Sequence, residues 1–341
     1  MLLLAGAASC GVANAQLSKN PDKFLGNITT RYSVDVTDGG KRFVYSDLWN
    51  QITPENESKW ASIEGSRGSY NWGSDNAYNY AKNHNFPFKF HCLIWGSQYP
   101  DWLNSLSTAE QYKAIEKWMD AIKKHYPHID MIDVVNEAVP GHAPAPYKAA
   151  LGGDGSTGYD WIIKAFEMAY ERWPDAILIY NDYNTFYADK RDAIIRLVKK
   201  LNAEEKLCDG VGMQGYIGGY GSQAGCMNPN DIRLIKEAIE KYKALGIEVQ
   251  LTEVAVRNYD GSESAMASHA EFYGNLFKML KSVNADGKNQ FTGITIWGIT
   301  DHPGMDENDY SYKMNGPYCG LYTKEYKPKE SYKKVYSVLK E

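Results

Sequence analysis

The sequence predicts a single-domain α/β protein whose eight parallel strands close into a (β/α)8 TIM barrel. Eight short apolar or β-branched segments are each predicted as a strand, an amphipathic segment follows nearly all of them, and no low-complexity linker interrupts the pattern. A strand, a helix and a further strand favour parallel pairing with a right-handed crossover, and eight such units can close a ring. The length of 341 residues fits one such barrel.

The predicted strands are short runs rich in aliphatic and aromatic residues, as expected for strands that are covered on both faces. In chain order they are Lys23–Ile28, Trp49–Glu55, Pro87–Trp95, Met131–Glu137, Ile177–Asp182, Gly210–Tyr216, Glu248–Glu253 and Gly293–Thr300. A doubly wound open sheet is the alternative fold. Such a sheet usually has a glycine-rich phosphate-binding turn after its first strand, and this sequence has none there.

The predicted helices follow nearly all of the strands and show apolar residues at helical spacing. They are Asp75–Asn83, Thr108–His125, Tyr159–Trp173, Lys190–Ala203, Asn230–Leu245, Ser264–Val283 and a last helix at Lys329–Lys340. Ser107 or Thr108 is available as the N-cap of the second of these helices. Gly246 is a helix stop directly before the seventh strand.

Composition narrows the class of partner. The net charge is −5 and acidic and basic residues are interspersed, so we expect neither nucleic acid nor an anionic membrane as a partner. Beyond the N-terminus no apolar run is long enough to span a bilayer. Aromatic residues make up 13% of the chain, a high share that fits a protein which stacks flat faces against a ligand.

The N-terminus resembles a secretion signal or its remnant in residues 1–15, followed by a catalytic domain in residues 16–341. No charge precedes Lys19, and small residues at 13 and 15 form a cleavage pattern. Cys10 also resembles the acylation site of a bacterial lipoprotein. We therefore expect a secreted or cell-surface protein.

Polar and aromatic residues recur at the ends of seven predicted strands. They are Glu55, Asn56, Lys59 and Trp60; His91, Trp95 and Gln98; Asn136 and Glu137; Asn181, Asp182, Tyr183 and Asn184; Gln214 and Tyr216; Glu253; and Trp297, Asp301 and His302. One such residue is usually a cap or a satisfied buried group. Because catalytic residues of barrels sit at the C-terminal strand ends, the repetition predicts a cleft lined by hydrogen-bonding groups.

Glu137 and Glu253 end the fourth and seventh strands, so their side chains are expected to face each other across the barrel mouth. The sequence has no histidine pair at metal-ligand spacing, no G-x-S-x-G elbow and no phosphate-binding loop. Five scattered cysteines include no CxxC pair, and whether Cys208 and Cys226 form a disulfide stays open. Two opposed carboxyl groups with amides and aromatic platforms predict glycoside hydrolysis without a metal or cofactor.

Seven motifs in order resemble glycoside hydrolase family 10, the endo-β-1,4-xylanases, from about Phe24 to Val338. They are TPENESKW, DVVNEAV, NDYN, GVGMQGY, QLTEV, TIWGITD and CGLYTKEYKPKESYKKV. This resemblance implies endo-acting hydrolysis of β-1,4-xylosidic bonds in xylan or xylo-oligosaccharides, with retention of configuration by double displacement. We expect the protein to act as a monomer.

The resemblance also implies roles for individual residues. Glu137 matches the general acid/base, Glu253 the nucleophile and Asn136 the residue that holds the 2-hydroxyl of the sugar being cleaved. Further substrate-binding residues are Glu55, Asn56 and Lys59 for the next sugar on the non-reducing side; His91, Trp95, Gln98, Gln214, Tyr216 and Trp297 around the reacting sugar; and Tyr183 and Asn184 on the leaving-group side.

The sequence departs from the family pattern at four places around the reacting sugar. Gly96 and Tyr216 replace histidines, Ala255 replaces an aspartate, and no second tryptophan follows Trp297. We expect these changes to open space near the reacting sugar, which leaves tolerance of arabinose or glucuronic acid branches undecided. The candidates to fill the volume of the missing tryptophan are His302, Tyr310 and Tyr312. Alternatively, the loop after the eighth strand folds elsewhere.

Three other functions stay open at this stage. A β-1,4-glucanase or mannanase is distinguished from a xylanase by its turnover on carboxymethylcellulose relative to xylan. A non-catalytic xylan-binding barrel would release no reducing sugar. A metal-dependent barrel hydrolase using Asp182, Asp301 and His302 would be sensitive to a chelator, but these residues match no strong ligand spacing.

Overall fold

The computed structural model describes residues 24–29, 34–38, 41–139 and 143–340. The expected secretion signal with Cys10, and Lys23 of the first predicted strand, lie outside the described residues. The signal, its cleavage and any acylation of Cys10 therefore stay predictions from the sequence.

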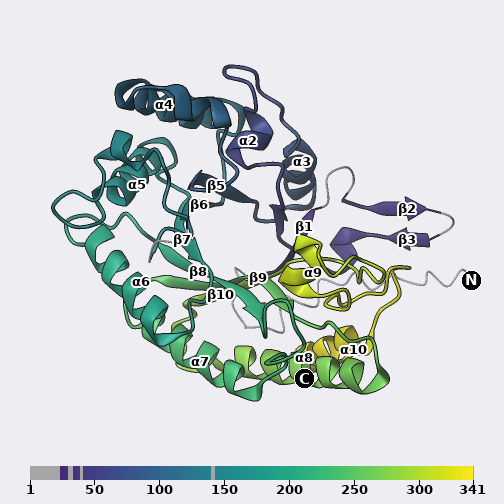
Figure 1. Ribbon diagram of the computed structural model, residues 1–341. Coiled ribbons are helices and arrows are strands. Elements are labelled where there is room, and N and C mark those ends of the chain that lie inside the picture. Colours follow the sequence, from purple (N-terminus) through teal and green to yellow (C-terminus); the bar gives the residue numbers. More distant parts are fainter. Residues whose placement is uncertain (1–23, 30–33, 39–40, 140–142, 341) are drawn as a thin grey trace, which may run out of the picture.

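Eight parallel strands form the barrel, which confirms the predicted fold (Figure 1). They are β1 (Phe24–Thr29), β4 (Ile52–Pro54), β5 (Lys89–Trp95), β6 (Met131–Asn136), β7 (Ile177–Asp182), β8 (Gly210–Ile217), β9 (Glu248–Val256) and β10 (Phe291–Ile296). Their order in the sheet is β4-β1-β10-β9-β8-β7-β6-β5. A parallel bridge between Ile52 and Phe88 joins the two end strands and closes the ring.

The longer helices surround the strands on the outside, as Figure 1 shows. The helices are α2 (Trp60–Ile63), α3 (Asp75–His84), α4 (Thr108–His125), α5 (Asp160–Arg172), α6 (Ala188–Leu201), α7 (Pro229–Lys243), α8 (Glu263–Ser282), α9 (Tyr310–Asn315) and α10 (Glu330–Lys340). The expected cap of α4 is present as a reciprocal pair between Ser107 and Glu110. None of the described helices is both long and apolar enough to cross a membrane.

Several element boundaries differ from the prediction. The predicted strand Trp49–Glu55 shortens to β4 because the Trp49 N–H bonds to the Tyr45 carbonyl in a preceding turn. The last strand ends at Ile296, because Gly298 has φ 136° and its N–H turns to the Asn27 side chain. Conversely, β9 continues to Val256, three residues further than predicted, and carries the next residue to the barrel mouth.

Some short elements were not predicted from the sequence. They are the antiparallel hairpin of β2 (Val36–Asp38) and β3 (Lys41–Phe43), the helices α2 and α9, and the 3-10 helices Tyr45–Asp47, Asp101–Ser105 and Lys148–Leu151. Each is too short to show a hydrophobic period in the sequence. Among them, α9 matters most for function, because it lies beside the strand ends that hold the predicted site.

Candidate active site

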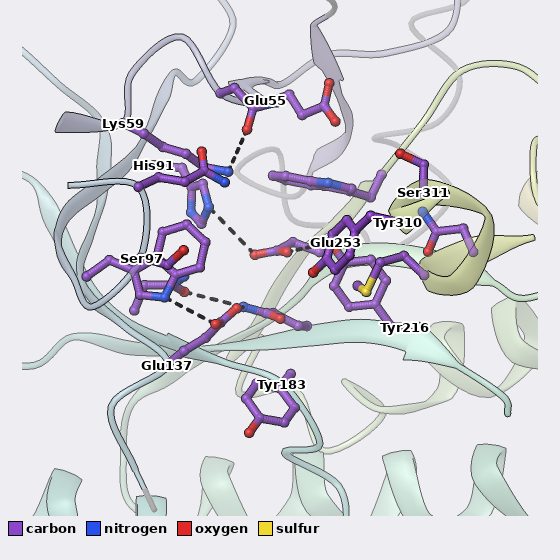
Figure 2. Close-up of a pocket in the computed structure, with 18 of the residues that line it drawn as sticks. Glu55, Lys59, His91, Ser97, Glu137, Tyr183, Tyr216, Glu253, Tyr310 and Ser311 are labelled. Carbon is purple, nitrogen blue, oxygen red and sulfur yellow. Dashed lines mark hydrogen bonds and ion pairs between the residues drawn. The ribbon is translucent and has the colours of Figure 1, made fainter. Parts of the chain in front are cut away.

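A cavity of about 850 Å³ lies at the C-terminal ends of the strands, and all of the predicted site residues line it (Figure 2). They are Glu55, Asn56, Lys59, His91, Trp95, Gln98, Asn136, Glu137, Tyr183, Asn184, Gln214, Tyr216, Glu253 and Trp297. These side chains come from seven segments that are far apart in the chain. The ring of parallel strands brings them together, because every strand ends at the same mouth.

The two carboxyl groups expected to face each other do so. Glu137 directly follows β6, Glu253 lies within β9, and Figure 2 shows both side chains pointing into the same space. Both have left-handed backbone, with φ of 55° and 53°, and so do Gln98 and Asn184 in the same cavity. Each such residue costs about 1–3 kcal/mol unless its surroundings compensate, and this kind of strain concentrates at functional sites.

A continuous chain of amide hydrogen bonds joins the two carboxyl groups. Gln214 Nε2 donates to Glu137 Oε1 at 2.8 Å and to Asn136 Oδ1 at 3.3 Å. Asn181 Nδ2 donates to the same Asn136 oxygen at 2.9 Å and to Glu253 Oε1 at 2.8 Å. Amides from β6, β7 and β8 thus fix the two acids relative to each other.

Glu253 is the more buried acid, with 5% of its surface exposed. Burial raises its pKa, and the nearby charge of Glu137 adds to the rise. The His91 ring, 4.0 Å from Oε1, and the hydrogen bonds from Tyr216 and Asn181 lower it again. Tyr216 OH donates to Oε2 at 2.8 Å, so the phenol does replace the family histidine as a donor. These contacts favour an ionised carboxylate despite its burial.

Buried polar side chains in the barrel interior hold the His91 ring in its orientation. His91 Nδ1 lies 2.8 Å from Asp133 Oδ2, and Asp133 in turn lies 3.9 Å from Lys89 Nζ. Lys89 Nζ donates to Gln250 Oε1 at 2.6 Å. All four residues are buried, so the cost of removing them from water is offset by these mutual contacts. The barrel interior therefore holds the imidazole ring in one orientation beneath the cavity.

Glu137 is half-buried and accepts bonds from two neutral donors. Trp95 Nε1 donates to Oε2 at 3.1 Å, opposite the Gln214 bond to Oε1. Lys59 Nζ lies 5.1 Å from the centre of the Trp95 ring and donates to Asn56 Oδ1 at 2.8 Å. The indole therefore serves both as a donor to Glu137 and as one wall of the cavity.

The backbone after Glu137 is held by a buried tyrosine. Tyr180 OH accepts from the N–H groups of Ala138 at 3.0 Å and Val139 at 2.9 Å, and donates to Asp182 Oδ2. Burial raises the pKa of Asp182 to about 7, while the ion pair with Lys190 at 2.8 Å and the Tyr180 bond oppose the rise. Asp182, one of the residues at the predicted strand ends, therefore supports the site from underneath.

The side-chain amide of Asn136 has an N–H2 group without a hydrogen-bond partner among the described residues. Asn136 is buried, and its Oδ1 accepts two bonds. A buried donor without a partner is costly, so such groups usually meet a ligand or water. Asn136 lines the cavity, so a ligand bound there is the candidate partner for this N–H2 group.

Seven further residues line the cavity: Ser97, Tyr220, Arg257, Tyr310, Ser311, Met314 and Asn315. From the sequence, Tyr310 was considered only as a replacement for the missing tryptophan, and the other six were not identified. The four from Tyr310 onward belong to α9, for which the sequence does contain a signal: Asp309 caps its start and Gly316 follows its end. Arg257 follows β9, and it was missed because that strand was predicted to end at Glu253.

The structure shows what occupies the space at two of the departures from the family pattern, Gly96 and the missing second tryptophan. A Cβ at position 96 would lie 2.2 Å from the Ala143 carbonyl oxygen, which accepts the Gly96 N–H. Backbone from the loop after β6 therefore occupies this place, and the expectation that Gly96 opens space is wrong. Of the three candidate filling residues Tyr310 lines the cavity, whereas Tyr312 packs on Tyr259 and His302 lies away from it. The loop after β10 thus folds onto the site.

The residues considered for a metal site are not grouped together. Asp182 pairs with Lys190 and Asp301 with Lys329 at 2.7 Å. Within the described part of the chain, no group of three or more His, Cys, Asp and Glu side chains is placed to hold a metal ion. Cys208 and Cys226 both carry free thiols, which settles the open question about their pairing.

Comparison with known proteins identifies the family of the chain. The model of glycosyl hydrolase family 10 matches residues 15–338. Endo-1,4-beta-xylanase B of Cellvibrio japonicus is 45% identical over 195 residues, 57% of this chain and 30% of that protein. Endo-1,4-beta-xylanase A of Thermotoga neapolitana is 33% identical over 306 residues, 83% of this chain and 27% of that protein. The chain thus spans less than a third of the length of these two relatives.

Solved structures match the fold over nearly the whole chain. A GH10 structure from Paenibacillus barcinonensis has a TM-score of 0.79 and 25% identity, covering 93% of this chain and 94% of that chain. Native xylanase 10B from Thermotoga maritima has a TM-score of 0.78 and 25% identity, covering 96% and 98%. With the family model matched from residue 15 to residue 338 and the same barrel in solved members, the chain belongs to glycosyl hydrolase family 10.

Proposed function

We propose that the protein hydrolyses β-1,4-xylosidic bonds within xylan, retains the anomeric configuration, and uses Glu137 as acid/base and Glu253 as nucleophile. The observation that carries the proposal is the pair of carboxyl groups that line one cavity and are joined through three amides. Two carboxyl groups are the apparatus of most glycoside hydrolases. The names of the relatives as endo-1,4-beta-xylanases support xylan as the substrate.

In the first step the ionised Glu253 attacks the anomeric carbon while Glu137 gives its proton to the departing oxygen. Tyr216 and Asn181 donate to opposite oxygens of Glu253, which holds the carboxylate plane ready for attack. The unpartnered Asn136 N–H2 group is the donor for the 2-hydroxyl of the reacting sugar. A contact that strengthens as positive charge develops on the sugar lowers the barrier selectively.

In the second step water attacks the anomeric carbon and Glu137, now ionised, takes the proton from that water. Glu253 is uncharged while it is esterified to the sugar, so it no longer repels a negative charge on Glu137. Breaking the ester returns Glu253 as a carboxylate. Both configuration changes occur at the same carbon, so the product keeps the anomeric configuration of the substrate.

We also propose that the protein acts outside the cell or at its surface. The support is the signal-like pattern of residues 1–15, together with the size of a polysaccharide that cannot enter a cell.

The deciding experiment follows the products of linear xylan and of carboxymethylcellulose by reducing-sugar release, viscosity and proton NMR. We expect activity on xylan, an early fall in viscosity from internal cleavage, and the β-anomer as the first product. A first product with the α-anomer would exclude the double displacement. Turnover limited to carboxymethylcellulose would favour a glucanase, and no release of sugar from either polymer would favour a binding protein.

A further inference from the structure

Arg257 stands out among the cavity residues that the proposed mechanism does not use. It directly follows β9, is 8% exposed, and lines the cavity. Its Nε donates to the Met314 carbonyl and its Nη1 to the Gly218 carbonyl at 2.8 Å. These two bonds fix the guanidinium between α9 and the loop after β8. They use two of its five N–H donors, so three remain.

A survey of buried basic side chains shows why Arg257 is unusual. Five of the buried lysines and arginines in the described residues have a carboxylate within 4.0 Å: Lys89, Lys190, Arg191, Lys243 and Lys329. The other two, Lys59 and Arg257, form no such pair, and both line the cavity. Because an unpaired buried charge is costly, each of these two cations is expected to meet a polar or charged group of a ligand.

Two tyrosines at the cavity rim lie near this arginine. Tyr220 is 56% exposed and Tyr310 is 70% exposed, the largest values among the big apolar side chains described. Both line the cavity, and Arg257 lies 5.6 Å from the Tyr220 ring centre. In Figure 2 Tyr310 lies to the right of Glu253, whereas Lys59 lies to its left. Exposed phenol rings provide faces on which a sugar ring can stack.

We propose that Arg257, Tyr220 and Tyr310 form a subsite for a carboxylate-bearing sugar branch on the polysaccharide, that is, for a uronic acid side chain. This deepens the proposed function and rests on it. The unbranched xylan backbone carries hydroxyl groups, which a single ammonium group can bind, but it offers no carboxylate to a planar guanidinium. A planar guanidinium with free N–H donors matches a carboxylate in a bidentate manner, which a lysine cannot do.

Lys59 is the natural comparison, because it also lacks a carboxylate. Its ammonium is held by Asn56 and lies over the Trp95 ring, on the other wall of the cavity. A compact ammonium group is suited to single hydroxyl groups of a neutral sugar. The two cations thus have different roles: Lys59 binds the polysaccharide backbone, and Arg257 binds a charged branch.

The experiment compares three oligosaccharides with the same backbone: one unbranched, one bearing a single glucuronic acid branch, and one whose branch has been reduced to the neutral sugar. The acidic and reduced branches share their shape and differ in charge. We expect wild-type kcat/KM to be about tenfold or more higher for the acidic than for the reduced substrate. In Arg257→Gln this ratio should fall close to one.

Arg233→Gln on α7 is the matched control, because it removes the same charge from a side chain that is 59% exposed and does not line the cavity. It should keep the wild-type ratio. Tyr310→Ala and Tyr220→Ala change exposed residues and should lower kcat/KM for both branched substrates relative to the unbranched one, because stacking does not depend on the branch charge. Arg257→Lys, which keeps the charge without the planar fork, should give an intermediate ratio.

Equal kcat/KM of the wild type for the acidic and the reduced substrate would refute the proposed subsite. This result does not depend on whether any variant folds. A wild-type ratio retained in Arg257→Gln would also refute the subsite. Absence of hydrolysis on all three substrates would instead refute the proposed function. In that case calorimetric titration of the wild type with the acidic and reduced oligosaccharides decides the subsite separately: tighter binding of the acidic one supports it, and equal binding refutes it.

Discussion

The two cavity acids sit in different surroundings. Glu253 is buried within β9 and is held by a phenol hydroxyl and an amide, with the His91 ring 4.0 Å away. Glu137 is half-buried, follows the end of β6, and receives N–H donors from an indole and an amide. The first acid belongs to the rigid sheet, whereas the second begins a loop.

This difference matches two chemical tasks. A carboxylate that attacks carbon has to stay ionised and in place, so burial within a strand and several donors suit it. A group that gives a proton to a leaving oxygen and later takes one from water needs access to both. The surroundings therefore assign the nucleophile to Glu253 and the acid/base to Glu137 under the proposed function. The following four tests challenge this assignment, from the largest expected effect to the smallest.

Removing the buried acid should have the largest effect. Glu253→Ala is expected to lower kcat on xylan on the order of 10⁴-fold or more, because no covalent intermediate can form. Added azide should restore turnover of an aryl xyloside and give a product of inverted configuration, measurable by proton NMR. Azide-dependent products of retained configuration would transfer the nucleophile role to another group.

Removing the loop acid should have an effect that depends on the substrate. Glu137→Ala is expected to lower kcat on xylan by about 10²–10⁴-fold, the usual contribution of a general acid. An aryl xyloside whose leaving group needs no proton should lose much less in its first step, measured as the burst of released phenol. An equal loss on both substrates would contradict the acid role of Glu137.

Tyr180→Phe tests the support of the loop without touching either acid. The Ala138 N–H group loses its acceptor, and the Val139 N–H group keeps only its long bond to Asp182 Oδ2 at 3.4 Å, so the free energy of unfolding should fall by about 1–3 kcal/mol. We expect kcat on xylan to fall about tenfold as Glu137 loses its fixed position. The pH at which activity falls on the acid side should stay unchanged, and Tyr170→Phe on the surface of α5 should match the wild type.

Tyr216→Phe should have the smallest effect at the optimum pH and a clear effect on the acid side. Hydrolysis needs ionised Glu253, so activity is lost as the pH falls through the pKa of Glu253. Burial raises this pKa and the Tyr216 hydrogen bond lowers it, so removing the hydroxyl raises it further. The acid limb of the kcat/KM profile is therefore expected to move to higher pH. A shift in the opposite direction, or none, would mean that Tyr216 does not support the ionised state.

Much of the fold and most of the site followed from the sequence. The strand Ile177–Asp182 and the helix Thr108–His125 have the predicted bounds, because apolar spacing and the Ser107 cap act within a few residues. All predicted site residues line one cavity, since the rule that parallel strands end at a common mouth needs only their order along the chain. The roles assigned to these residues still await the tests above.

The second wall of the cavity could not be predicted in this way. Arg257 bonds to Gly218 and to Met314, which lie 39 and 57 residues away, and no local pattern announces either contact. The same holds for Gly96, whose missing side chain is explained only by the Ala143 backbone lying against it.

By itself, the sequence determined the barrel, the positions of its strands and the meeting of two acids. Apolar periodicity within short segments and the order of those segments along the chain can both be read from the sequence directly. The tertiary structure alone decided that α9 folds back over the mouth, that Tyr310 takes a place at the rim, and that Arg257 is buried without a carboxylate. These features depend on steric fit and hydrogen bonds between loops from different strands, and such contacts exist only once the ring has closed.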